Sequence, residues 1–189
     1  MRIGLLGGTF DPVHLGHLRL AEGALKQLQL DLVLWIPAHL PPHKQMGVRA
    51  GPQDRARMVE MAIRGNPFFR LSRVDLDRPP PSYTIETLRR LRQQYPSARL
   101  FFLLGSDNGR ELDRWRQIDQ LRKWVRFAAV GRPGDPAADR LASDIIRLPI
   151  STPNVSSSDV RQRVRLGLEI RRLVPPAVAR FIEEKGLYR

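Results

Sequence analysis

The four histidines are the side chains of this sequence best suited to chemistry, and they lie in two short stretches. His14 and His17 form one pair, and His39 and His43 form the other. An imidazole can donate a hydrogen bond to a phosphate oxygen, transfer a proton or bind a metal ion. The residues around each pair decide which of these roles is open to it.

The surroundings of the first pair favour phosphate binding. Gly7, Gly8 and Gly16 leave backbone amides accessible, and His17 begins a predicted helix whose N-terminal dipole attracts an anion. Two other interpretations remain open at this point. The interval between His14 and His17 is also compatible with a catalytic zinc site, which needs three protein ligands. Both histidines could otherwise belong to an ordinary turn and helix cap.

Apolar runs alternate with amphipathic stretches along the whole chain. The apolar runs predict buried strands at 3–6, 32–36, 68–72, 100–104, 127–130 and 145–148. The apolar spacing and the Pro and Gly positions predict helices at 17–28, 52–64, 83–94, 156–166 and 175–185. Strands that alternate with helices predict an α/β fold, with a mostly parallel sheet and helices on both faces.

The predicted sheet brings both histidine pairs to one edge. In open α/β sheets, ligands bind beyond the carboxyl ends of the strands. The loops at 7–16, 38–51, 105–115 and 131–135 follow predicted strands and should share this rim. We therefore expect a binding site built from these four loops.

Length and composition predict one folded domain. The 189 residues are 42% hydrophobic and 27% charged, and show no linker or internal repeat, so we assign 1–189 to a single domain with a helical part at about 156–189. The absence of cysteine excludes disulfides and thiolate metal sites. There is neither an apolar run of membrane-spanning length nor a signal-peptide pattern. We expect a cytoplasmic protein without a membrane partner, either a monomer or a homo-oligomer.

The formal net charge of +13 allows two interpretations. A basic surface attracts polyanions such as nucleic acids. However, only four of the 32 basic residues are lysines, which is equally typical of an arginine-rich compositional bias. The basic residues are spread along the chain and no RNA-binding signature is present, so we expect no nucleic-acid partner. A basic nucleic-acid-binding domain remains the non-enzymatic alternative.

Two motifs resemble the signatures of the nucleotidyltransferase superfamily. The stretch 8–17, GTFDPVHLGH, is similar to GTFDPxHxGH, and 155–161, VSSSDVR, is similar to ISSTxxR with Ser158 in place of threonine. The resemblance implies a Rossmann-like, doubly wound fold that binds ATP or CTP as the magnesium complex. It also implies transfer of a nucleotidyl group with release of pyrophosphate.

The segments between these motifs resemble bacterial nicotinate-nucleotide adenylyltransferases. They are PPHK at 41–44, SYTIETL at 82–88, GSDN at 105–108, Trp115, GRPG at 131–134, and the segments 174–176 and 187–188. The resemblance implies that the 5′-phosphate of nicotinate mononucleotide attacks the α-phosphorus of ATP, giving deamido-NAD and pyrophosphate in NAD biosynthesis. An adenylyltransferase with nicotinamide mononucleotide or phosphopantetheine as acceptor is the alternative. The phosphopantetheine enzymes usually carry threonine at the position of His14.

The resemblance also implies roles for individual residues. His14 and His17 are the catalytic candidates. The ATP-binding candidates are Gly7, Gly8, Thr9, Phe10, His14, Gly16, His17, Ser156, Ser157, Ser158 and Arg161. The candidates for binding the acceptor are Lys44, Thr84, Gly105, Asp107, Trp115 and Arg132. The attacking phosphate is already an anion, so no general base is required. We expect Mg²⁺ to arrive with ATP, without dedicated metal ligands.

Overall fold

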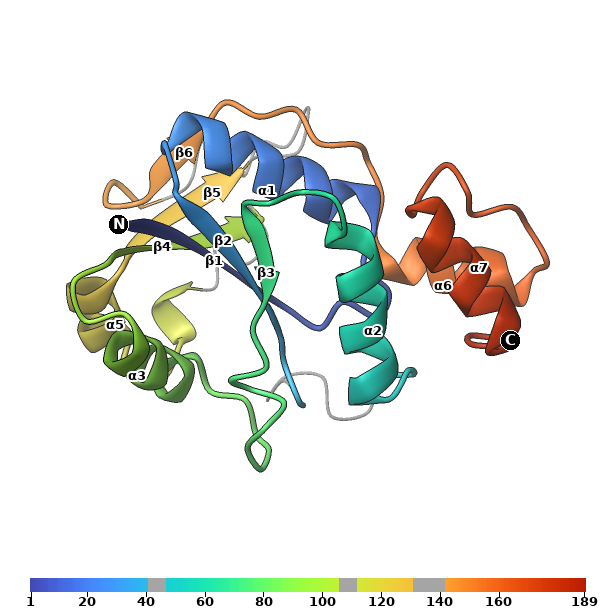
Figure 1. Cartoon of the computed structure of the whole chain (residues 1–189), viewed down its shortest axis with the longest axis horizontal. Coiled ribbons are helices and arrows are strands. Elements are labelled where there is room, and N and C mark those ends of the chain that lie inside the picture. The colour runs from blue at the N-terminus through green and yellow to red at the C-terminus, as the bar shows by residue number, and fades with distance from the viewer. Residues whose placement is uncertain (41–46, 106–111, 131–141) are drawn as a thin grey trace.

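The computed structural model describes residues 1–40, 47–105, 112–130 and 142–189 (Figure 1). Its centre is a six-stranded sheet in the order β3-β2-β1-β4-β5-β6, and every pair of neighbouring strands is parallel. The strands are β1 (Arg2–Gly8), β2 (Leu32–Pro37), β3 (Phe69–Leu71), β4 (Arg99–Gly105), β5 (Arg126–Val130) and β6 (Ile146–Leu148). This is the doubly wound Rossmann order, in which the strand order reverses between β1 and β4.

Helices cover both faces of the sheet (Figure 1). They are α1 (Leu15–Gln27), α2 (Pro52–Ile63), α3 (Thr84–Gln94), α5 (Ile118–Trp124), α6 (Ser157–Arg165) and α7 (Pro176–Glu184), with a 3-10 turn, η1, at Leu112–Arg114. Residues of α1 and α2 belong to the apolar cluster on one face, and residues of α3 and α5 belong to the cluster on the other. α6 and α7 lie together at the side of the molecule, where α7 packs against α2 (Figure 1).

The central strands are buried on both faces, which explains why their sequences do not alternate between apolar and polar residues. All six residues of β2 are buried, as are the five apolar residues that precede Gly105 in β4. Val33 and Trp35 face one apolar cluster, whereas Leu32 and Leu34 face the other. The carboxyl ends of these strands are therefore held rigidly, and the loops that follow them start from fixed positions.

The α/β prediction is confirmed, and each strand and helix expected from the sequence is present within one or two residues of its expected limits. The sheet is fully parallel over the described strands, whereas the sequence predicted a mostly parallel one. Sequence analysis missed α5, a helix of seven residues. No helix in the described part of the chain is long and apolar enough to cross a membrane.

The burial of α3 against the sheet predicts that shortening one of its core side chains strongly lowers the free energy of unfolding. Leu91 is fully buried, whereas Leu166, after α6, is 62% exposed. Leu91→Ala should lower the free energy of unfolding by about 2–5 kcal/mol because it leaves a cavity in a close-packed core. Leu166→Ala should change it by less than about 0.5 kcal/mol. Urea denaturation measures both values, and equal effects would contradict the packing described above.

Candidate active site

A cleft of about 560 Å³ opens at the carboxyl ends of β1, β4 and β5, between α1 and the start of α6. Its lining includes all residues that the sequence analysis places on ATP: Gly7, Gly8, Thr9, Phe10, His14, Gly16, His17, Ser156, Ser157, Ser158 and Arg161. Gly105 lines it as well. A second hollow of about 570 Å³ lies between β3 and α3 but contains no residue of either motif. The chemistry therefore belongs to the first cleft.

The two histidines of the first motif are held against each other at the start of α1. His14 is the residue before the helix, and its backbone N–H donates a hydrogen bond to Nδ1 of His17 over 3.2 Å. The two rings stack with their centroids 3.6 Å apart. Because Nδ1 of His17 accepts this hydrogen bond, the proton of the neutral ring lies on Nε2. His17 is thus set up as a hydrogen-bond donor through Nε2.

Phe10 and two glycines shape the wall of the cleft. Phe10 adopts a left-handed backbone conformation, with φ of 50°, and its buried ring meets the ring of His17 edge-on at 5.0 Å. A Cβ atom at Gly8 would come within 3.0 Å of the Phe10 ring. A Cβ atom at Gly16 would come within 3.0 Å of the His14 ring. The glycines of the motif therefore permit close packing of the aromatic and imidazole rings.

The second motif is joined to the first by side-chain to backbone hydrogen bonds. Ser156 caps α6, since its Oγ accepts from the backbone N–H of Asp159. The hydroxyl of Ser157 donates to the carbonyl of Pro12 over 2.9 Å. Arg161 donates through Nη1 to the carbonyl of Asp11 over 2.8 Å. These contacts place the start of α6, with its N-terminal dipole, beside the loop that follows β1.

Asp11, in the first motif, is a buried acceptor. Its carboxylate accepts from the backbone N–H groups of Arg49 (2.8 Å) and Ala50 (3.0 Å), and from the hydroxyl of Tyr188 (2.8 Å). With three donors directed at it, this carboxylate is engaged in holding the structure.

Arg55 is fully buried, and all its hydrogen bonds among the described residues go to backbone carbonyls. Nη1 donates to Thr9 and Ala38, each over 2.7 Å, Nη2 donates to His39 over 2.8 Å, and Nε donates to Ala50 over 3.2 Å. Burial lowers the pKa of this guanidinium, and the neighbouring Asp11 carboxylate opposes that effect. One side chain of α2 therefore ties the loop after β1 to the loop after β2.

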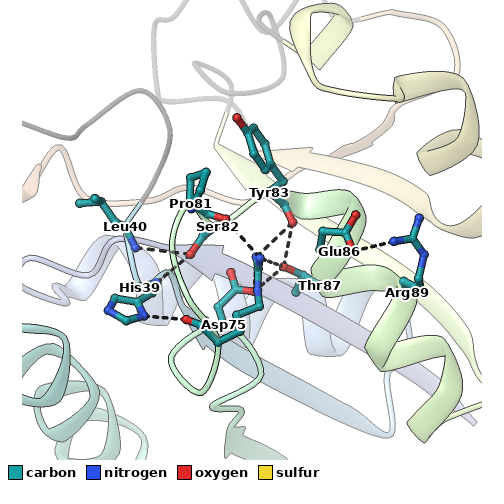
Figure 2. Close-up of polar contacts among 10 residues, drawn as sticks. His39, Leu40, Asp75, Pro81, Ser82, Tyr83, Glu86, Thr87 and Arg89 are labelled. Carbon is teal, nitrogen blue, oxygen red and sulfur yellow. Dashed lines mark hydrogen bonds and ion pairs between the residues drawn. The ribbon is translucent and has the colours of Figure 1, made fainter.

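A second buried network shapes the segment before α3 (Figure 2). Asp75 accepts from Nε (3.1 Å) and Nη2 (2.9 Å) of Arg78 and from the hydroxyl of Thr87. Arg78 also donates to the carbonyls of Pro81 and Tyr83, each over 3.2 Å. This ion pair is buried, and the Thr87 hydroxyl and the two carbonyls add hydrogen bonds that support it. It fixes the backbone that leads into Thr84.

The same network extends to the loop after β2 (Figure 2). The backbone N–H groups of His39 and Leu40 donate to the hydroxyl of Ser82, over 2.9 and 3.4 Å. Nδ1 of His39 lies 2.8 Å from the carbonyl of Arg78 and must donate to it, because a carbonyl only accepts. His39 thus joins two loops. Among the described residues, no group of three or more His, Cys, Asp or Glu side chains could hold a metal ion.

The residues expected to bind the acceptor are only partly covered by the described regions. Thr84 is the first residue of α3, and Trp115 follows η1, where its ring packs edge-on against Phe102 at 5.5 Å. Neither Thr84 nor Trp115 belongs to the described lining of the cleft. Lys44, Asp107 and Arg132 lie outside the described residues, as does His43.

Comparison with known proteins agrees with these motifs. A family model described as cytidylyltransferase-like matches residues 5–163. A probable nicotinate-nucleotide adenylyltransferase of Exiguobacterium sibiricum is 44% identical over 188 residues, covering 100% of this chain and 99% of that protein. A probable nicotinate-nucleotide adenylyltransferase of Thermus thermophilus is 42% identical over 190 residues, covering 100% of both chains.

A solved structure with a similar fold is Plasmodium falciparum nicotinic acid mononucleotide adenylyltransferase complexed with NaAD. The TM-score is 0.80 at 19% identity, with 99% of this chain and 97% of that chain covered. A nicotinate-nucleotide adenylyltransferase structure described as putative, from Vibrio parahaemolyticus, has a TM-score of 0.73 at 23% identity, covering 100% of this chain and 95% of that chain. Together these likenesses confirm the Rossmann-like fold.

The four carbonyls around Arg55 predict that its loss is costly. Arg55→Met keeps much of the side-chain volume but leaves buried carbonyls without a donor, so the free energy of unfolding should fall by at least about 3 kcal/mol. Arg57→Met is the matched control on the same helix, because Arg57 is half exposed and pairs only with Glu60 among the described residues. It should cost less than about 1 kcal/mol. Urea unfolding of both variants measures the difference, and similar values would show that Arg55 does not hold the two loops together.

Proposed function

Because the chain belongs to the family of nicotinate-nucleotide adenylyltransferases, we propose that it transfers the adenylyl group of ATP to nicotinate mononucleotide. The products are deamido-NAD and pyrophosphate. The observation that carries the proposal is the single cleft in which both signature motifs meet at the ends of β1 and β4. The expectation of an enzyme is confirmed by this family membership.

The reaction needs alignment and charge neutralisation more than proton transfer. An oxygen of the 5′-phosphate of the mononucleotide attacks the α-phosphorus of ATP. The bond from that phosphorus to the bridging oxygen of the β-phosphate breaks, and pyrophosphate leaves with the bond's electrons. Both reactants are anions, so they repel each other. Hydrogen-bond donors aimed at the transferring phosphoryl group offset that repulsion and stabilise the charge that develops there.

His17 and His14 are the proposed donors to the α-phosphate. Because Nδ1 of His17 accepts from the His14 backbone, the proton of the neutral ring lies on Nε2, which is the atom proposed to donate to a phosphate oxygen. The stacked ring of His14 and the ring of Phe10, which makes a T-shaped contact, both restrict the rotation of the His17 ring. A donor that is already oriented loses little entropy when the transition state forms.

The second motif is proposed to hold the β- and γ-phosphates. The N-terminus of α6 provides free backbone amides, and the hydroxyls of Ser157 and Ser158 lie in the same turn. Arg161 is anchored through Nη1 to Asp11 and through Nη2 to Ser158. Its planar guanidinium is thereby oriented to bind two phosphate oxygens.

For the acceptor, Lys44 and Arg132 are proposed to bind the phosphate of nicotinate mononucleotide. Asp107, Thr84 and Gly105 are proposed to contact its ribose or the region around its base. Trp115 is proposed as the stacking partner of the pyridine ring, because an aromatic face orients a ring without demanding specific hydrogen bonds.

Magnesium is proposed to enter as part of the Mg-ATP substrate. Among the described residues, Asp11 supplies the only carboxylate in the lining of the cleft, and three donors already point at it. We propose that ATP would supply the main ligands of Mg²⁺, without a dedicated set of protein ligands.

The acceptor is tested by pyrophosphate release from Mg-ATP with nicotinate mononucleotide, nicotinamide mononucleotide, phosphopantetheine or flavin mononucleotide. We expect release with nicotinate mononucleotide well above the other acceptors, and loss of release when EDTA removes the metal. Release with only a different acceptor would overturn the substrate assignment. If no acceptor gives pyrophosphate release, the proposed reaction is wrong.

Substitution of His17 tests the proposed catalytic donor. His17→Ala removes one preorganised donor, so kcat should fall by roughly a hundredfold to a thousandfold while the circular dichroism spectrum stays unchanged. The matched control is Arg19→Ala, on the exposed side of the same helix, where Arg19 pairs only with Glu22 among the described residues. It should retain nearly full kcat. A normal kcat in His17→Ala would remove His17 from the mechanism.

A further inference from the structure

Tyr188, which lies beyond α7, reaches the loop of the first motif. Its hydroxyl donates to Oδ1 of Asp11 over 2.8 Å, across 177 positions of the sequence. α7 packs against α2, and Leu187 and Tyr188 pack against the apolar cluster on that face of the sheet. The ring of Tyr188 is thus supported by the core, while its hydroxyl points at a residue that lines the cleft.

The backbone on both sides of this contact is strained. Tyr188 has φ of 69° and Phe10, the residue before Asp11, has φ of 50°. For bulky residues the left-handed region is costly, and it persists only where surrounding contacts enforce it. One of these residues is the donor of the hydrogen bond and the other precedes the acceptor in the chain, which indicates that the contact is held in place by the fold around it.

Burial, together with the Asp11 carboxylate, keeps the Tyr188 hydroxyl protonated as a donor. Burial and the adjacent Asp11 carboxylate raise the pKa of Tyr188 above its ordinary value, and the nearby charges of Arg161 and Arg55 oppose this effect only in part. Both guanidinium groups act on Asp11, since Arg161 donates to its backbone carbonyl and the charge of Arg55 interacts with its carboxylate. The hydrogen bond from Tyr188 to Asp11 is therefore made to an ionised acceptor, which is the stronger kind.

Asp11 is held from two directions by different parts of the molecule. The backbone amides of Arg49 and Ala50 hold its carboxylate from the start of α2, and Tyr188 holds it from the segment after α7. The carbonyl of Asp11 in turn accepts from Arg161. Asp11 is thus the point where the first motif, the second motif and the segment after α7 meet.

We propose that Tyr188 is a positioning residue for ATP, acting through Asp11. By fixing Asp11 it holds the turn that leads into His14 and the carbonyl that orients Arg161. Both ends of the triphosphate site then keep their geometry before ATP binds. The proposal deepens the function proposed above, because it assigns the segment after α7 to the nucleotide half of the site and not to the acceptor half.

The test is Tyr188→Phe, which removes the hydroxyl and keeps the ring in the core. Loss of one hydrogen bond to a charged group should weaken the binding of Mg-ATP, measured by calorimetry without acceptor, by roughly tenfold. In steady state, KM for ATP should rise by a similar factor, while KM for nicotinate mononucleotide stays within about twofold. A purely structural role would lower the unfolding temperature without this split between the two KM values.

Tyr95→Phe is the matched control. The Tyr95 hydroxyl makes no hydrogen bond among the described residues, and its ring packs against the apolar cluster on the other face. Its removal should leave both KM values and the affinity for Mg-ATP unchanged. If Tyr95→Phe weakens ATP binding as much as Tyr188→Phe does, the assignment of Tyr188 is wrong.

A double-substitution cycle tests whether the effect passes through Asp11. In an Asp11→Asn background, Tyr188→Phe should weaken Mg-ATP binding by less than about twofold, because the charged acceptor is already gone. A full tenfold effect in that background would overturn the route through Asp11.

Calorimetry with ATP alone also separates the role of Tyr188 from the proposed acceptor. A wild-type protein that binds Mg-ATP but releases no pyrophosphate with nicotinate mononucleotide would refute the acceptor and leave the role of Tyr188 measurable.

Discussion

The geometry of the cleft depends on the buried guanidinium of Arg55. A buried cation is tolerated only when acceptors surround it, and here the acceptors are backbone carbonyls from two strand-end loops. Those loops therefore converge on α2 in the folded protein. The loop that carries His14 and His17 consequently has its shape before any ligand arrives, which is the condition that electrostatic catalysis requires.

Much of the fold could be predicted because the central strands are short apolar runs and the helices carry one apolar face. The sequence did not predict α5, because two turns are too short to show a helical period and only Leu121 among its residues is fully buried. The motif residues of the cleft could be predicted from their resemblance to two signatures. What the sequence could not indicate is that Ser157 and Arg161 use part of their hydrogen-bonding capacity on the backbone of the first motif.

The residues that sequence reasoning missed act through distant backbone groups. Arg55 reaches Thr9 across 46 positions and Tyr188 reaches Asp11 across 177, so no local sequence pattern predicts either contact. In a chain in which arginine supplies nearly all the basic residues, one more arginine on a helix carries no signal. The available clue for Arg55 was its position on the apolar side of α2, beside Ala56 and Val59, where an exposed arginine is not expected.

Both buried carboxylates among the described residues, Asp11 and Asp75, accept hydrogen bonds from three donor groups each. This matters for a site that must bring two anionic phosphates together. A free carboxylate in the cleft would add to their repulsion. A carboxylate held by amides, a hydroxyl and nearby guanidinium groups stabilises the loops instead, and it adds little negative potential to the cleft. The cleft then presents imidazoles, hydroxyls, helix amides and Arg161 to the phosphates. The same hydrogen bonds that hold the acidic side chains in the scaffold therefore also leave the cleft lined mainly by donors to phosphate.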